Sequence, residues 1–421
     1  MWLSASPFTR PERRSRAHDS FVIGWWVRGL GLGTLAHTNL ADFQQAGWLA
    51  PELIGWVGGS LLLITPLRPS QPFQRDLRLV FAWICGLLCL AKLYTLLTLR
   101  DVLTQSLLLC CYYALAALGL WAPRWSHSAL RASAICAGLT YLLAALHKVN
   151  SDFIYSEYSC ALHGVDLSVG LFHSGVFPVQ LVDLLDGFMI WARRHTELSA
   201  CSVLAWEALL GALCIAGSRW ILLFGGLFHT PLTLSIAPAF GSVMAVGWGA
   251  SSLSKLGRRN RARAPRPPRG RWLIIIPITY GLHGGLSPYL GIEYQHSAAM
   301  LSNLRIDPPC ANSLIFPTLA SDPYIYIDEI SFGERERPKR SEIVRETLWN
   351  LSALYTMQHN WCIPEQRPLR VQLRYHGVEV ILDDLCDEDA LDDLSRGQPF
   401  ARGWQRFQKN LSRQCHTQCV H

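Results

Sequence analysis

The chain has 421 residues, of which 50% are hydrophobic and only 16% are charged, whereas soluble globular domains carry about 25% charged residues. With 16 Trp and a positive mean hydropathy, this composition excludes an ordinary soluble domain and indicates a chain that largely faces lipid. The formal net charge is +7, but the basic residues stand in short runs beside apolar segments. That pattern fits membrane topology, and we expect no nucleic-acid partner.

The N-terminal segment, residues 1–20, contains PFTRPERRSRAH, a basic flank that precedes the first apolar run. Basic flanks mark the cytoplasmic side of a first span, so we expect this segment to be cytoplasmic. No early stretch combines a short apolar core with a small-residue cleavage site, and a cleaved signal peptide is not expected.

Membrane spans need about 20 mostly apolar residues. Nine segments meet that requirement, at about 21–40, 49–66, 79–98, 103–121, 131–149, 199–217, 220–236, 238–253 and 272–291. Pro231 and Pro238 interrupt the pair between 220 and 253, so this pair is either two spans or one long span with a re-entrant piece. Residues 255–271 hold eight basic and no acidic residues and are predicted to form a cytoplasmic loop, whose low-complexity part, residues 259–271, is expected to be disordered.

Residues 150–198 are not a simple span, because Gly, Pro and His break their short apolar pieces. The piece PVQLVDLLDGFMIW has apolar residues near helical spacing, with Asp183 and Asp186 off the apolar face. This pattern predicts a helix lying in the membrane interface.

Residues 292–421 form a polar tail, which the alternation of basic loops places outside the cytoplasm. Its runs YIYIDEISF and LRVQLRYHGVEVIL predict strands, and RSEIVRETLWNLSALY predicts a helix. The expected fold class is therefore an all-α polytopic membrane protein of about nine spans, with a small extracytoplasmic α+β C-terminal region.

Ionisable side chains inside spans are costly and usually face a cavity or a partner. Glu207 lies near the middle of its span, and His229 lies about 15 Å into another, at about 1.5 Å per residue. A structural pair for Glu207 and an interhelical hydrogen bond for His229 are the alternatives to a functional role. Other ionisable residues within or near spans are Arg28, Lys92 and His283.

Lys148 closes the fifth predicted span, in the string YLLAALHKVNSDF. It either extends to the membrane surface or pairs with Asp152 one turn later, or it serves as a base. A lysine removed from water gives up its proton more readily, which would make a free amine available.

These strings resemble the membrane domain shared by vitamin K-dependent gamma-carboxylases and the HTTM (horizontally transferred transmembrane domain) proteins. The resemblance rests on YLLAALHKVNSDF, on Glu207 in the next full span, and on the strings GLFHTPLTLSIAPAFGSVMAV and AAMLSNLRID (residues 298–307). The resemblance covers about residues 20–310, so 21–291 would be the HTTM-like domain. The chain is similar to bacterial members of this family, which implies that it lies in a bacterial cytoplasmic membrane.

The resemblance implies that Lys148 is the base that deprotonates reduced vitamin K or another hydrophobic quinol. Oxygenated vitamin K would then remove a γ-proton from a glutamate of a peptide substrate, to which carbon dioxide adds. Lys148, Glu207 and His229 are the expected catalytic residues, and the substrate-binding residues are His147, Asn150 and Asp152. The connection WAPRWSHSALR lacks the carboxylases' Asn-His-Tyr-Trp element, so the resemblance extends further for the fold than for the reaction. The alternative is a non-catalytic scaffold, transport or quinone-binding component.

The 13 Cys are scattered, and their odd count defines no disulfide framework. Those inside apolar runs, such as Cys85 and Cys110, are expected to behave as small hydrophobes. The string CHTQC at residues 415–419 lacks a standard zinc spacing, and no metal site is expected there; a frayed segment or one disulfide is favoured.

Overall fold

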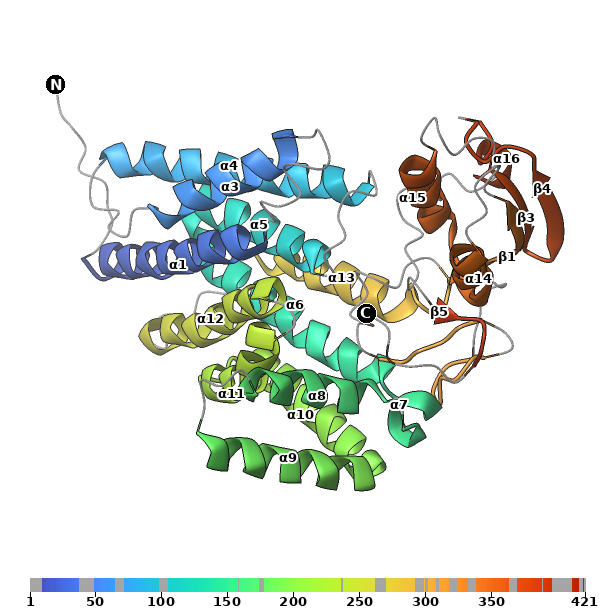
Figure 1. The fold of residues 1–421 in the computed structure, drawn as a ribbon. Helices are drawn as coiled ribbons and strands as arrows, with labels where there is room; N and C mark the ends of the chain where they lie inside the picture. Colours follow the sequence, from blue (N-terminus) through green and yellow to red (C-terminus); the bar gives the residue numbers. More distant parts are fainter. Residues whose placement is uncertain are drawn as a thin grey trace. The chain divides into compact units, whose positions relative to one another are not determined.

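The computed structural model describes residues 10–37, 49–64, 72–97, 105–157, 159–173, 178–235, 238–261, 270–291, 299, 302–307, 310–317, 324–331, 338–362, 369–387, 389–395, 411–415 and 419. Figure 1 shows a mostly helical chain with one small sheet. The chain divides into two compact units. The first comprises residues 1–94, 105–142 and 208–281, and the second comprises 95–104, 143–207 and 282–421.

Every predicted span coincides with a helix. The helices in these regions are α1 (Arg10–His37), α3 (Leu49–Leu63), α4 (Pro72–Leu97), α5 (Ser106–Trp121), α6 (Ser126–His147), α10 (Thr196–Ala216), α11 (Trp220–Ser235), α12 (Pro238–Arg261) and α13 (Ile275–Leu286). Two short 3-10 helices, η1 (Pro123–Trp125) and η2 (Arg271–Ile274), precede α6 and α13. The 220–253 region forms two separate helices, and Pro231 lies inside the first of them.

Three helical stretches in the described residues are long and apolar enough to cross a membrane, namely Asp76–Leu96, Pro123–His147 and Thr196–Ala216. The helices Leu53–Leu63 and Ser106–Trp121 are apolar but shorter. The structure thus supports three spans by length and hydropathy, and the count of nine stays a prediction. The difference arises because several predicted spans form helices of 16 residues or fewer, such as α11 and α13.

Small residues let α6 and α10 approach closely. A Cβ atom added at Gly138 would lie 2.9 Å from the Gly211 carbonyl oxygen, and one added at Gly211 would lie 2.9 Å from the Gly138 carbonyl oxygen. Glycine at both positions is therefore required for this backbone contact, as is common between membrane helices. The contact matters for function because Lys148 follows α6 directly and Glu207 precedes Gly211 by one turn of α10.

Three helices follow α6 and precede α10 in the sequence, namely α7 (Ser151–Tyr155), α8 (Cys160–Phe172) and α9 (Val179–Arg194). Helix α9 packs against α8 and buries Met189 and Ala192. Leu184, Phe188 and Trp191 of the same helix are exposed, as expected for a helix that meets a membrane interface.

The C-terminal region forms a five-stranded antiparallel sheet with the order β4-β3-β1-β2-β5. The strands are β1 (Ile325–Ser331), β2 (Thr347–Trp349), β3 (Arg370–Tyr375), β4 (Val378–Leu382) and β5 (Leu411–Ser412), and the helices are α14 (Pro338–Glu346), α15 (Leu351–Trp361) and α16 (Asp392–Ser395). Buried residues of α14 and α15, including Val344 and Leu354, share one core with Ile325 and Val371 of the sheet. The predicted α+β character of this region is confirmed.

One helix prediction in this region is wrong. The stretch RSEIVRETLWNLSALY forms α14 and α15 but is interrupted by the strand Thr347–Trp349. These residues pair with β1 on one side and β5 on the other, which buries Leu348. Asn350 then starts α15 as its N-cap, since its side chain accepts a hydrogen bond from the Ala353 amide.

Six cysteines form three disulfides: Cys160–Cys419, Cys310–Cys415 and Cys362–Cys386. The string CHTQC therefore contributes to two disulfides, where at most one was expected. The other seven cysteines are free, and all lie in apolar helices as predicted. All six disulfide cysteines belong to the second unit.

This pairing gives a countable prediction. When the protein is made in an oxidising compartment and alkylated in denaturant without reductant, seven cysteines should react; after reduction all 13 should react. Mass spectrometry of the intact protein and its peptides measures both numbers. Thirteen alkylated cysteines without reductant would contradict the three disulfides.

A carboxylate on β1 binds two arginines. Asp328 accepts hydrogen bonds from Arg374 on β3 at 2.7 Å and from Arg413 at 3.0 Å. Both guanidinium groups also lie 5.5 Å from the ring of Tyr326. The hydrogen bond from Arg374, with a further one from Arg413, holds the pKa of Asp328 below its ordinary value.

Because its folded pKa is lowered, Asp328 contributes stability above its unfolded pKa of about 3.9, and this contribution is lost as the pH falls through the folded pKa. We expect Asp328→Asn to reduce hydrogen-exchange protection of β1 near neutral pH and to have progressively less effect as the pH falls through the lowered folded pKa of Asp328. Asp383→Asn is the control, because the Asp383 side chain is 93% exposed. Equal losses for both variants at neutral pH would disprove the role of Asp328.

Candidate functional site

A buried ion pair joins two residues that the sequence marked separately. The Lys148 Nζ atom donates a 2.9 Å hydrogen bond to Glu207 Oε1, and the two side chains are 6% and 10% exposed. Both residues belong to the second unit. The sequence offered Asp152 as the partner of Lys148, whereas the ion pair that the structure shows is with Glu207.

The end of α6 places the lysine. The Lys148 amide still bonds to the carbonyls of Ala144 and Ala145, but the next residues leave the helix. Asn150 is extended and serves as N-cap of α7, with its Oδ1 atom accepting from the Phe153 amide at 2.8 Å. This cap brings the buried Phe153 ring 5.9 Å from the Lys148 ammonium, a favourable cation–π contact.

His147 anchors the same turn to the last turn of α13 and to Tyr289, which follows that helix. Its Nε2 atom donates to the Gly284 carbonyl at 2.9 Å, since a carbonyl oxygen can only accept. In the neutral ring, Nδ1 then accepts from the Tyr289 hydroxyl at 3.2 Å. His147 is fully buried, so these bonds hold the backbone around Lys148. Its predicted role in substrate binding stays a prediction.

Asn150 uses its whole side chain internally. Besides capping α7, its Nδ2 group donates to the His147 carbonyl at 2.9 Å and to the Ser302 carbonyl at 2.6 Å. Both amide hydrogens are thereby used. Asn150 therefore joins α6, α7 and residues 302–313, and its binding of a substrate stays a prediction.

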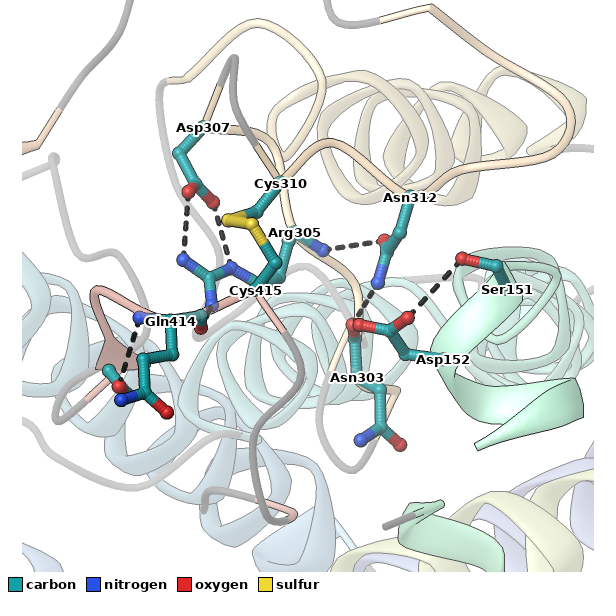
Figure 2. Close-up of a disulfide and its surroundings, with 10 residues drawn as sticks. Ser151, Asp152, Asn303, Arg305, Asp307, Cys310, Asn312, Gln414 and Cys415 are labelled. Carbon is teal, nitrogen blue, oxygen red and sulfur yellow. Dashed lines mark hydrogen bonds and ion pairs between the residues drawn. A yellow bond between two sulfur atoms is a disulfide. The ribbon is translucent and has the colours of Figure 1, made fainter. Parts of the chain in front are cut away.

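The string AAMLSNLRID was marked by the family resemblance, but its contact with Asn150 and the role of Asn312 were not predicted. Figure 2 shows Asn312, whose Oδ1 accepts from the Arg305 amide at 2.8 Å and whose Nδ2 donates to the Asn303 carbonyl at 2.7 Å. Asp152, 8% exposed, accepts a 3.3 Å hydrogen bond from Ser151.

A second buried ion pair supports this network. The Arg305 guanidinium bonds both oxygens of Asp307, at 2.9 and 2.7 Å, and both side chains are 2% exposed. Arg305 also donates to the Gln414 carbonyl, beside the Cys310–Cys415 disulfide (Figure 2). Residues 411–415 are thus fixed to the segment that Asn150 binds.

His229 lies in the first unit, in a cluster of aromatic rings. Its Nε2 atom is 2.7 Å from the Tyr141 hydroxyl, which also accepts a 3.0 Å hydrogen bond from the indole of Trp248. The rings of Phe240 and Trp248 lie 5.0 and 5.4 Å from the imidazole. This is the interhelical hydrogen bond considered as the alternative for His229, and its catalytic role stays a prediction.

The ion pair leaves one acceptor unused. The Oε2 atom of Glu207 is buried and has no hydrogen-bond partner in the part of the chain that the structure describes. A buried carboxylate oxygen without a partner is costly. It is therefore the place in this site where a hydroxyl or amide hydrogen of a ligand would be bound. Among the described residues, no group of three or more His, Cys, Asp or Glu side chains could hold a metal ion.

Comparison of the chain with protein family models, with curated proteins and with solved structures gave no match.

Breaking the ion pair should be costly, whereas replacing it as a whole should not. Lys148→Met or Glu207→Leu alone leaves an uncompensated buried charge and should lower the free energy of unfolding by about 3–5 kcal/mol. The double variant should recover most of that loss. Unfolding of the purified protein in detergent micelles measures all three. Additive losses in the double variant would mean that the two residues are not coupled.

Proposed function

We propose that this chain is an integral membrane protein of the HTTM and gamma-carboxylase-like class, in which Lys148 and Glu207 act as an acid–base centre for a lipid-soluble quinol. One observation carries the proposal: a buried carboxylate, held by a buried lysine, keeps one oxygen without a partner. Ionisable residues within a membrane span usually mark functional sites.

The membrane location rests on the three apolar helices and the basic loops between the predicted spans. The disulfides support an extracytoplasmic position for the C-terminal region, since disulfides persist in oxidising compartments. The N-terminal segment and residues 255–271 would then face the cytoplasm.

In this proposal the pair takes up one proton as a unit. A quinol hydroxyl donates to Glu207 Oε2, its O–H bond breaks, and the proton stays on the carboxyl group. The Lys148 ammonium remains beside the new quinolate and stabilises its negative charge in a low-dielectric site. If the proton within the pair instead rests on Glu207, the free Lys148 amine is the acceptor. Only the second route gives Lys148 the role of base that the family resemblance assigns to it; in the first route Glu207 is the base and Lys148 stabilises the product anion.

The later steps are carried by the resemblance alone. An oxygenated quinol would abstract a γ-proton from a glutamate of a peptide substrate, and carbon dioxide would add to that carbon. His147 and Asn150 act in this scheme as positioning residues, because their bonds fix the turn that carries Lys148. Asp152 would bind substrate and His229 would act in catalysis, as the resemblance implies, and neither would do so as a member of the Lys148–Glu207 ion pair.

A non-catalytic quinone-binding or scaffold role is the second candidate. It is favoured by the closed geometry of the ion pair, in which the lysine already has its partner, and by the internal bonds of His147 and Asn150. A scaffold needs the pair for stability only, so its ligand binding would not depend on proton transfer.

Quinol binding and oxidation by the protein in vesicles separate the two roles. The wild type should bind reduced vitamin K and convert it in the presence of oxygen and bicarbonate. Glu207→Gln keeps the side-chain size but removes the charge, and should lower turnover by at least about 100-fold, the low end of a general-base contribution. Lys92→Ala on α4 is the matched control and should leave turnover unchanged.

Turnover in the wild type that survives in both Glu207→Gln and Lys148→Ala would rule out the acid–base role. Binding without turnover in every variant would favour the scaffold role. Complete extraction of the protein from membranes by alkaline carbonate would rule out the integral membrane location as well.

A further inference from the structure

Two of the free cysteines face each other across two helices of the first unit. The Cys89 thiol on α4 donates to the Cys110 carbonyl at 3.6 Å, and the Cys110 thiol on α5 donates to the Cys89 carbonyl at 3.5 Å. The two thiol groups also interact directly with each other. A cysteine that only fills space needs no thiol partner, and its reactivity usually decides why it is present.

The reciprocal contacts are those of a pair that can form a disulfide. Each thiol reaches the backbone of the other residue, so the two backbones lie within the reach of a cysteine side chain, as a disulfide requires. Both cysteines are free in the structure, so the pair is in its dithiol form. A disulfide between them would join α4 to α5.

The surroundings of the pair decide which oxidant can reach it. Cys89 is about 20 Å from the start of the candidate span Asp76–Leu96 and about 10 Å from its end, at about 1.5 Å per residue. The Cys89 side chain is half-buried, and its neighbours Leu87 and Leu90 are 56% and 63% exposed. Cys110 is 6% exposed. In a membrane, an oxidant would therefore arrive through lipid and meet Cys89 first.

We propose that Cys89 and Cys110 form a redox-active dithiol that reduces a lipid-soluble quinone to its quinol. This inference rests on the proposed function for the membrane location and for the quinone class of substrate. It does not use the chemistry of Lys148 and Glu207, because the dithiol lies in the first unit and the ion pair in the second.

The reaction balances with these two thiols and one quinone. As the Cys89 sulfur adds to the quinone ring, its proton passes to one quinone oxygen. Cys110 then attacks the Cys89 sulfur, the bond between that sulfur and the ring breaks, and the S–S bond forms. The Cys110 proton ends on the second oxygen, so the quinone gains two electrons and two protons while the dithiol loses them.

Anaerobic reaction with decylubiquinone tests the inference, since its fully substituted ring disfavours a stable thiol adduct. The full chain is reconstituted into phosphatidylcholine vesicles. We expect the number of alkylated cysteines without reductant to fall from seven to five, and peptide mapping to find a Cys89–Cys110 disulfide. Absorbance should show one quinol formed for each disulfide. Cys89→Ser and Cys110→Ser should abolish quinol formation, whereas Cys201→Ser, which removes an exposed free cysteine of α10, should not.

Glu207→Gln should form the same disulfide and the same amount of quinol, so a failure of the acid–base centre is seen separately from a failure of the dithiol. A wild-type protein that forms no Cys89–Cys110 disulfide with the quinone would overturn the inference. A disulfide between Cys111 and Cys136, whose thiols also interact, would overturn it as well if it formed instead. Ferricyanide, which does not enter lipid, should leave the pair reduced; equally fast closure by ferricyanide would contradict access through lipid.

Discussion

The ion pair between Lys148 and Glu207 depends on each partner to keep the other charged. Both side chains are at least 90% buried, and the desolvation of a single charge at such a site costs several kcal/mol. Features of α6 and α10 support the contact between the two residues. Helix α6 ends where the lysine must turn toward α10, and Gly138 and Gly211 let the two backbones approach closely before that point. A buried ion pair is weak evidence for stability alone, so a site of this kind calls for a functional explanation.

Ending a helix inside a low-dielectric region creates a second constraint, because backbone groups lose their helical partners. Three asparagine side chains replace the missing backbone partners. Asn150 caps α7, Asn303 accepts from the Cys160 amide at 2.7 Å, and Asn312 accepts from the Arg305 amide. Asn303 also adopts a left-handed conformation, with φ of 54°, which asparagine tolerates better than most residues. An asparagine provides both a donor and an acceptor without a charge, so it replaces missing backbone partners at a lower desolvation cost than an ionised residue.

Much of the fold could be predicted from the sequence because apolar runs of helical length carry their own signal. Each of the nine predicted spans overlaps a helix, although among the described residues three helical stretches meet the length and hydropathy of a span. The strand at Thr347–Trp349 could not be predicted in the same way, since its three residues follow helical spacing and form a strand only through pairing with β1 and β5. Tertiary hydrogen bonding decided that segment.

For the site, the sequence marked both members of the ion pair but could not join them, because 59 residues separate Lys148 from Glu207. Local spacing favoured Asp152 as the partner of Lys148, and only the packing of α6 on α10 replaces it with Glu207. The string AAMLSNLRID was marked by the resemblance, but the bonding of its residues was not predicted. Nothing in the spacing shows that Arg305 and Asp307 are almost fully buried.

The disulfides show that the C-terminal region is part of the site's support. Disulfides join Cys415 to Cys310 and Cys419 to Cys160 at the start of α8, and Arg305 bonds the carbonyl of Gln414, the residue before Cys415. Cys160 belongs to the same apolar cluster as Phe153, whose ring lies 5.9 Å from the Lys148 ammonium. One of the covalent links therefore ends in the apolar cluster beside the lysine. A region attached only for solubility would not need such links, whereas a turn that must hold a buried charge in one position benefits from them, because a disulfide removes conformations in which that turn is open.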